Sequence, residues 1–141
     1  MNNQNQLAPL LTDFGLASFS NQNKLGVVGF QAVTVNGHSI HIAPPEVLSN
    51  TVDGNYYAVD IYAYGIVLYE IVNRTSAWVG LNKDQIKQQV MNSNRPELSP
   101  DVQNVMAQDP TMKNLVRLIN MAWVQNPLMR PDAIRIQQFL S

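Results

Sequence analysis

Asp13 ends an apolar run and is followed by a Phe and a Gly, in the stretch LLTDFGLAS at residues 10–18. The residues before it predict a short buried strand, so the chain would hold this carboxylate rigidly at the strand end. The triplet also suits a plain turn in which the Asp caps local backbone amides. Three residues alone favour the turn, so a catalytic interpretation depends on the motifs in the rest of the chain.

Composition limits the classes of protein and of partner. The chain has 141 residues, which suit one domain with its own core. Only 13% of them are charged, the net charge is −1, and Lys and Arg form no cluster. This balance argues against a nucleic-acid or membrane-surface partner. The lack of cysteine fits a reducing compartment and residues 1–6 are no signal peptide, so we expect a cytoplasmic protein.

A long apolar stretch in the middle of the chain predicts a central helix over residues 56–72. The stretch is shorter than the ~20 residues that span a bilayer, and it contains Asp60 and Glu70. A helix that is apolar on nearly every face is typical of the centre of a protein. We therefore expect this to be the central helix of the fold.

Local patterns predict a long loop before the central helix and two short helices after it. Residues 17–42 show no periodicity, and a loop of that length in a compact domain is usually functional or disordered. Asn82 and Gln85 match a capping box that opens a helix over residues 83–91. A capping serine and a first-turn proline predict a minor helix near residues 101–106.

Two further helices are predicted toward the end of the chain. Asp109 and Pro110 open the first, which carries a full amphipathic face. The apolar residues of that face are Leu115, Leu118, Ile119, Ala122 and Trp123. Pro131 opens the last helix. The residues of this helix that we expect to face inward are Ala133, Ile136 and Leu140.

The Asp-Phe-Gly triplet is the first of five landmarks along the chain. After a loop at residues 16–43 come PPEVL at 44–48, DIYAYGIVLYEI at 60–71, NRPEL at 94–98 and MAWVQNPLMRP at 121–131. Their order and spacing resemble the C-terminal lobe of a eukaryotic protein kinase, most closely the tyrosine-kinase-like group of Ser/Thr kinases. The resemblance implies a mainly α fold: a kinase C-lobe fragment with a small β remnant at the N-terminus and a central buried helix.

The resemblance divides the chain into a lead-in (1–9), the DFG strand and loop (10–15), an activation segment (16–46) and a helical C-lobe (47–141). It implies that Asp13 holds Mg²⁺ on the phosphates of ATP. Phe14 would pack beneath the nucleotide site, and Gly15 would let the loop turn sharply. Ser39 stands where the substrate-contacting loop of the family usually has Thr, which favours Ser/Thr over Tyr in the protein substrate.

The resemblance also implies structural roles for four residues. Glu46 would form a buried ion pair with Arg130, Asp60 would accept hydrogen bonds from the backbone of the catalytic loop, and Trp123 would pack in the helical core. The plain alternatives are an exposed Glu at a helix start and an Asp that caps a helix end. Pro44 departs from the family pattern, which has Ala there, and removes an N–H donor from the loop.

The catalytic parts that precede Asp-Phe-Gly in kinases have no counterpart in this sequence. These are the Gly-rich loop, the strand Lys, its Glu partner and the His-Arg-Asp catalytic loop. We therefore expect no catalytic base here, no tight binding of ATP or Mg²⁺, and no activity without the missing N-lobe and catalytic-loop segment. We expect Met1 to be an internal methionine of a longer kinase that uses ATP and Mg²⁺ to phosphorylate protein Ser/Thr.

Two other interpretations are open. The chain could be a non-catalytic, kinase-like binding or scaffold module whose exposed helices bind a partner. It could also be an unrelated helical protein, which a contact between Glu46 and Arg130 would contradict.

Overall fold

The computed structural model describes residues 40–141, and all regular structure within that range is helical. The helices in chain order are η2 (Ile40–Ile42), α2 (Pro45–Leu48), α3 (Tyr56–Asn73), α4 (Lys83–Met91), α5 (Pro100–Gln108), α6 (Pro110–Ala122), η3 (Pro127–Met129) and α7 (Ala133–Leu140). The mainly α prediction is confirmed. The strand predicted just before Asp13 lies outside the described residues.

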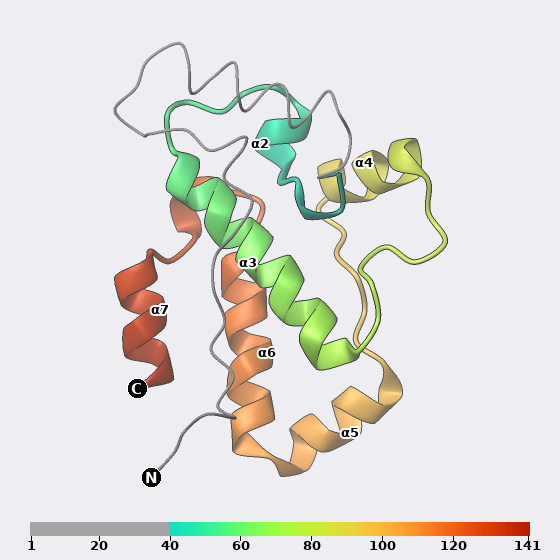
Figure 1. Cartoon of the computed structure of the whole chain (residues 1–141), viewed down its shortest axis with the longest axis vertical. Helices are drawn as coiled ribbons and strands as arrows, with labels where there is room; N and C mark the ends of the chain where they lie inside the picture. Colours follow the sequence, from blue (N-terminus) through green and yellow to red (C-terminus); the bar gives the residue numbers. More distant parts are fainter. Residues whose placement is uncertain (1–39) are drawn as a thin grey trace, which may run out of the picture.

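The long helix α3 runs through the middle of the described part of the molecule (Figure 1). α6 and α7 lie on one side of it, whereas α2 and α4 lie on the other. The most extensive helix–helix packing is between α3 and α6. The prediction of a central helix over residues 56–72 is therefore confirmed. None of the helices within residues 40–141 is long and apolar enough to cross a membrane.

Side-chain caps set the starts of the shorter helices where the sequence predicts them. Asn82 and Gln85 form the capping box, in which each side-chain oxygen accepts the backbone N–H of the other residue at 2.9 Å. The Ser99 hydroxyl accepts the Val102 N–H at 3.3 Å, and α5 runs further than predicted, to Gln108. These bonds satisfy N–H groups that have no partner inside the helix.

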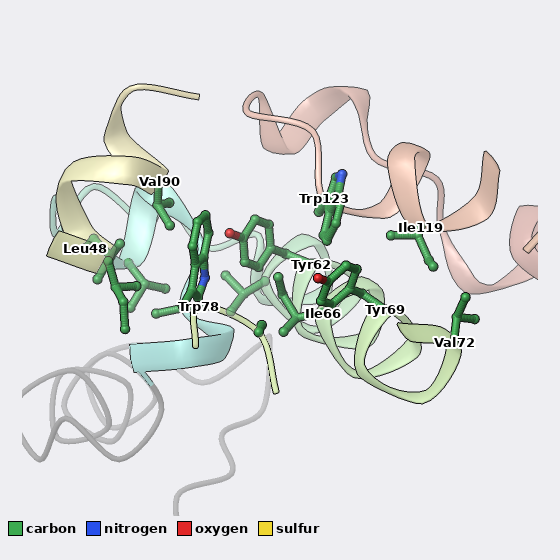
Figure 2. Packing of buried hydrophobic residues seen from close by; sticks show 14 of the residues in the cluster. Leu48, Tyr62, Ile66, Tyr69, Val72, Trp78, Val90, Ile119 and Trp123 are labelled. Atoms are coloured by element: carbon green, nitrogen blue, oxygen red, sulfur yellow. The ribbon is translucent and has the colours of Figure 1, made fainter. Parts of the chain in front are cut away.

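The core forms on both sides of α3. Tyr62 and Ile66 are fully buried, and Figure 2 shows them between the indole of Trp78 and that of Trp123. Tyr69 lies next to Trp123, with 5.6 Å between the ring centroids and a tilt of 41°. Tilted aromatic pairs at this separation contribute about 0.5–1.5 kcal/mol beyond the burial of their surface.

α3 keeps an exposed apolar face, since Val67 and Ile71 are 45% and 68% exposed. One expectation about burial, that for the last helix, is wrong. In α7 only Ile136 is buried, whereas Ala133 and Leu140 are exposed. The reason is the orientation of α7, in which Phe139 lies under the Arg117 guanidinium of α6 at 5.6 Å. The packing face of α7 therefore runs through positions 136 and 139.

The close approach of α3 and α6 predicts the effect of one substitution, Gly65→Ala. A Cβ at Gly65 would lie 2.9 Å from the Cβ of Ala122, so the two helices would have to move apart. Overpacking of about 1–3 kcal/mol outweighs the gain in helix propensity of about 1 kcal/mol. We expect a net loss of about 1 kcal/mol in the free energy of unfolding, measured by urea denaturation. The double variant Gly65→Ala/Ala122→Gly should recover part of this loss, and an equal loss in both would contradict the explanation.

Candidate functional site

Four of the predicted site residues lie outside the described residues, namely Asp13, Phe14, Gly15 and Ser39. The structure places the other four, which are Glu46, Asp60, Trp123 and Arg130. The candidate site is therefore built from these four residues and their neighbours.

Glu46 and Arg130 are in contact although they lie 84 positions apart in the chain. The two terminal guanidinium nitrogens of Arg130, Nη1 and Nη2, donate to the two carboxylate oxygens of Glu46, at 2.5 Å and 3.0 Å. Both residues are buried, and the Arg130 side chain has no exposed surface. Paired charge-assisted bonds of this kind are among the strongest polar contacts in proteins, and they fix the orientation of both groups.

Backbone carbonyl groups take the other donors of Arg130. Nη1 donates to the Ala58 oxygen at 2.9 Å, and Nε donates to the Val124 oxygen at 3.0 Å. Nη2 reaches the Gln125 oxygen at 3.4 Å. A buried charge is tolerated only when such partners replace water. One side chain thus joins α2, the first turn of α3 and the segment that follows α6.

Local backbone structure places both Glu46 and Arg130 for this contact. Pro44 and Pro45 precede Glu46 and fix the backbone at the start of α2, whose four residues are all buried. At the other end, the Asn126 side chain caps η3 by accepting the Leu128 N–H at 3.0 Å. η3 ends at Met129, and Arg130 follows it in an extended conformation that brings the Arg130 side chain back toward α3.

Two residues that sequence reasoning did not assign complete this cluster, Tyr62 and Arg95. The Arg130 guanidinium lies over the Tyr62 ring at 5.1 Å, and the Arg95 guanidinium lies over the same ring at 5.2 Å. Cations within about 6 Å of an aromatic face are attracted to it, and more strongly where water is excluded. An Arg in the NRPEL segment is the only sequence feature that points to this contact, and it does not identify the ring.

Burial tunes the ionisation of the cluster. It raises the pKa of Tyr62 to about 12, with the cations Arg95 and Arg130 acting in the opposite direction. The Tyr62 hydroxyl therefore stays neutral, and no hydrogen-bond partner for it is found within residues 40–141. Burial also lowers the pKa of the Arg95 guanidinium. The charge balance of the site therefore depends on two cations and one carboxylate, that of Glu46.

Asp60 and Trp123 lie in different surroundings. Trp123 is buried against Tyr69 in the core, as expected. Asp60 lies at the surface of α3, and the cap of this helix is Asn55 rather than Asp60, because Asn55 accepts the Ala58 N–H at 3.2 Å. Neighbouring protein still removes enough water to raise the pKa of the Asp60 carboxyl above its usual value of 3.8.

Comparison with protein families matches residues 1–139 to the protein kinase domain. The chain is 33% identical over 132 residues to a mimivirus protein named as a putative serine/threonine-protein kinase/receptor, and 30% identical over 130 residues to the RGS domain-containing serine/threonine-protein kinase A of Dictyostelium discoideum. It is also 32% identical over 149 aligned positions to the activin receptor type-1 of Gallus gallus.

These alignments cover most of this chain but little of the relatives. They include 92–93% of the 141 residues, and they span 8%, 10% and 29% of the three relatives. The match therefore establishes the family of this domain, and it does not establish the activity of a whole protein.

The buried ion pair predicts a large effect for Glu46→Gln. The change leaves the Arg130 guanidinium buried without a counter-charge, and breaking such a pair typically costs ~3–5 kcal/mol. We expect a fall of about 3 kcal/mol in the free energy of unfolding, measured by urea denaturation. Glu70→Gln is the matched control, because Glu70 accepts the Ala77 N–H at 2.7 Å and pairs with no cation within residues 40–141. Equal small losses in both variants would contradict the prediction.

The raised pKa of Asp60 predicts a pH-dependent effect for Asp60→Asn. A carboxyl whose folded pKa exceeds its unfolded value opposes folding once it ionises, so its unfavourable contribution grows as the pH rises through the folded pKa. We expect Asp60→Asn to stabilise the chain at pH 7 and to have no such benefit below pH 3.8, the ordinary pKa. Thermal unfolding across this pH range measures the difference, and a benefit that is constant with pH would contradict it.

Proposed function

The chain belongs to the protein kinase family, and from that premise we propose that it forms the C-lobe portion of a kinase of the tyrosine-kinase-like group. In the complete domain, the γ-phosphate of ATP would pass to Ser or Thr of a protein substrate. The relatives at 30–33% identity whose names include serine/threonine-protein kinase support this specificity. The observation that carries the proposal is the buried Glu46–Arg130 pair, which ties the end of the proposed activation segment to the last helices.

The residues that we propose for the nucleotide site are Asp13, Phe14 and Gly15. A carboxylate oxygen is the type of donor that Mg²⁺ prefers, so the chemistry of Asp13 fits that ion. When bound, Mg²⁺ neutralises developing charge on the phosphate oxygens. The roles left to this chain are to hold the metal-binding carboxylate and to position the loop that ends at Glu46. Ser39 is the residue that we assign to the substrate-contacting loop.

The proposal requires further parts of a kinase domain, and the surface of α3 supports their docking. Asp60, Tyr64, Val67 and Ile71 recur at intervals of four, three and four residues, so they share one face of the helix. Tyr64, Val67 and Ile71 are 39%, 45% and 68% exposed. We propose that the catalytic-loop segment donates backbone N–H groups to Asp60 and that apolar residues of the same domain cover this face.

The second candidate function is a non-catalytic scaffold module of kinase-like fold. The same exposed face of α3 favours it, because contiguous apolar surface commonly marks a protein interaction site. In both cases we propose a cytoplasmic location, in keeping with the cysteine-free composition.

A chimera distinguishes the two functions. The region of the mimivirus relative that aligns with this chain over 132 positions is replaced by the chain, and the rest of the relative is kept. If the kinase function is correct, the chimera should phosphorylate Ser or Thr of a protein substrate such as myelin basic protein, and the reaction should require ATP and Mg²⁺. Asp13→Ala should abolish it, because the carboxylate for the metal is lost, whereas the isolated chain should be inactive.

The matched control is Asp53→Ala, which removes an exposed carboxylate before α3. It should leave phosphorylation unchanged. A chimera that folds, as judged by a cooperative thermal transition, but transfers no phosphate would favour the scaffold function. Activity that survives Asp13→Ala would contradict the role assigned to that carboxylate.

A further inference from the structure

Arg95 is a second cation at the Glu46–Arg130 pair, and the proposed kinase chemistry does not account for it. It lies in the coil between α4 and α5 and is half-buried. No acidic side chain forms an ion pair with it within residues 40–141. A cation in such a place needs other partners, and these are backbone carbonyls, one amide and one aromatic ring.

The hydrogen bonds of Arg95 join the ends of two helices. Nε donates to the Trp123 oxygen at 2.8 Å, at the C-terminal end of α6, where the helix dipole favours a cation. Nη1 donates to the Asn94 oxygen at 2.9 Å and reaches the Val90 oxygen of α4 at 3.5 Å. Nη2 donates to the Gln125 side chain at 2.8 Å.

Arg95 and Arg130 share two partners, the ring of Tyr62 and the residue Gln125. Both guanidinium groups lie over the Tyr62 ring, at 5.2 Å and 5.1 Å. Both also bind Gln125, Arg95 at the side-chain oxygen and Arg130 at the backbone oxygen. The carbonyls of residues 123, 124 and 125 are thus divided between two arginines. A shift of either arginine would displace groups that bind the other.

The Tyr62 ring can serve this role because close packing surrounds it. It is fully buried in the middle of α3, and its hydroxyl points toward the Trp78 indole (Figure 2) without a hydrogen-bond partner in the described part of the chain. The ring face, and not the hydroxyl, is therefore the part of Tyr62 that the two cations use.

We propose that Arg95 is a positioning residue for the Glu46–Arg130 pair. Acting through the Tyr62 ring and Gln125, it fixes the orientation in which the Arg130 guanidinium meets both oxygens of Glu46. The meaning of that pair as the anchor of an activation segment rests on the proposed function, whereas the coupling itself does not.

A double-mutant cycle between Arg95→Met and Glu46→Gln tests this coupling. Residues that act independently give additive changes, and coupled residues do not. In Glu46→Gln there is no carboxylate for the Arg130 guanidinium to be aligned with, and the repulsion between Arg95 and Arg130 is no longer offset by a negative charge. Arg95→Met should therefore destabilise this variant less than it destabilises the original chain. We expect the increase in the unfolding equilibrium constant on Arg95→Met to be at least about three-fold smaller in the Glu46→Gln background.

Arg117→Met is the control, because Arg117 also lies over an aromatic ring, that of Phe139 at 5.6 Å, but belongs to the contact between α6 and α7. Its effect should be additive with Glu46→Gln. Additive behaviour of Arg95→Met as well would overturn the proposal.

The NMR signal of the Arg130 Nε–Hε group provides a readout that a loss of stability alone would not move. This group donates to Val124 and lies close to the Tyr62 ring, so its resonance reports the orientation of the guanidinium. It should shift in Arg95→Met and not in Arg117→Met. Arg95→Lys should behave like Arg95→Met, because an ammonium group cannot reproduce the fork of donors. Full restoration by Lys would overturn the positioning role.

Gln125→Ala carries the test if Arg95→Met does not fold. It removes the side-chain amide that Arg95 binds, keeps the Gln125 backbone oxygen and leaves every charge in place. The Arg130 Hε signal should again shift, and an unchanged signal would overturn the proposal. Neither measurement involves phosphoryl transfer, so the failure of this proposal and that of the proposed function are distinguishable.

Discussion

The burial of one charged side chain, Arg130, constrains the whole described structure. A guanidinium without water needs an opposite charge and oxygen partners for its other donors. The oxygen partners come from Glu46, from Ala58 in α3 and from the segment after α6. These three parts are distant in the sequence, so the charge can be compensated only when the helices have assembled correctly. The Glu46–Arg130 pair therefore forms only in the native arrangement of the helices, and it also contributes to the stability of that arrangement.

Packing around α3 depends on the same centre. Tyr62 lies under the Arg130 guanidinium, and its neighbours in the core include the indoles of Trp78 and Trp123. Polar and apolar contacts thus meet at a single ring. A change in the polar contacts would therefore disturb the apolar packing, and the reverse also holds, because protein interiors are close-packed and side chains have little room to adjust.

The faces of α3 differ in how fully the described residues cover them. α6 packs on one side and the residues around Trp78 pack on the opposite side, whereas the face that holds Val67 and Ile71 is exposed. The exposed side also holds Asp60, whose carboxyl has a raised pKa. Exposed apolar residues commonly mark an interaction surface, and a carboxylate covered there would need hydrogen-bond donors in place of water. Within residues 40–141, α3 is thus packed on two sides and has one exposed apolar face.

Sequence reasoning succeeded where the information is local. The capping box at Asn82, the extent of α3 and the apolar face of α6 follow from hydrogen-bond geometry and periodicity within a few residues. The contact between Glu46 and Arg130 came from a family pattern and not from spacing. The inward face of α7 was predicted wrongly, because a pattern of three apolar residues does not tell which of them another helix covers.

Residue patterns alone predict a set of helices with defined starts, a central apolar helix and kinase-like landmarks in order. The folded arrangement was needed to find that Arg95 and Arg130 share the Tyr62 ring and divide the carbonyls that follow α6. It also decided which face of α3 is covered. The physical reason is that caps and periodicity are set by neighbours along the chain. The compensation of buried charge and the choice of a packed face depend instead on groups that folding brings together from far apart.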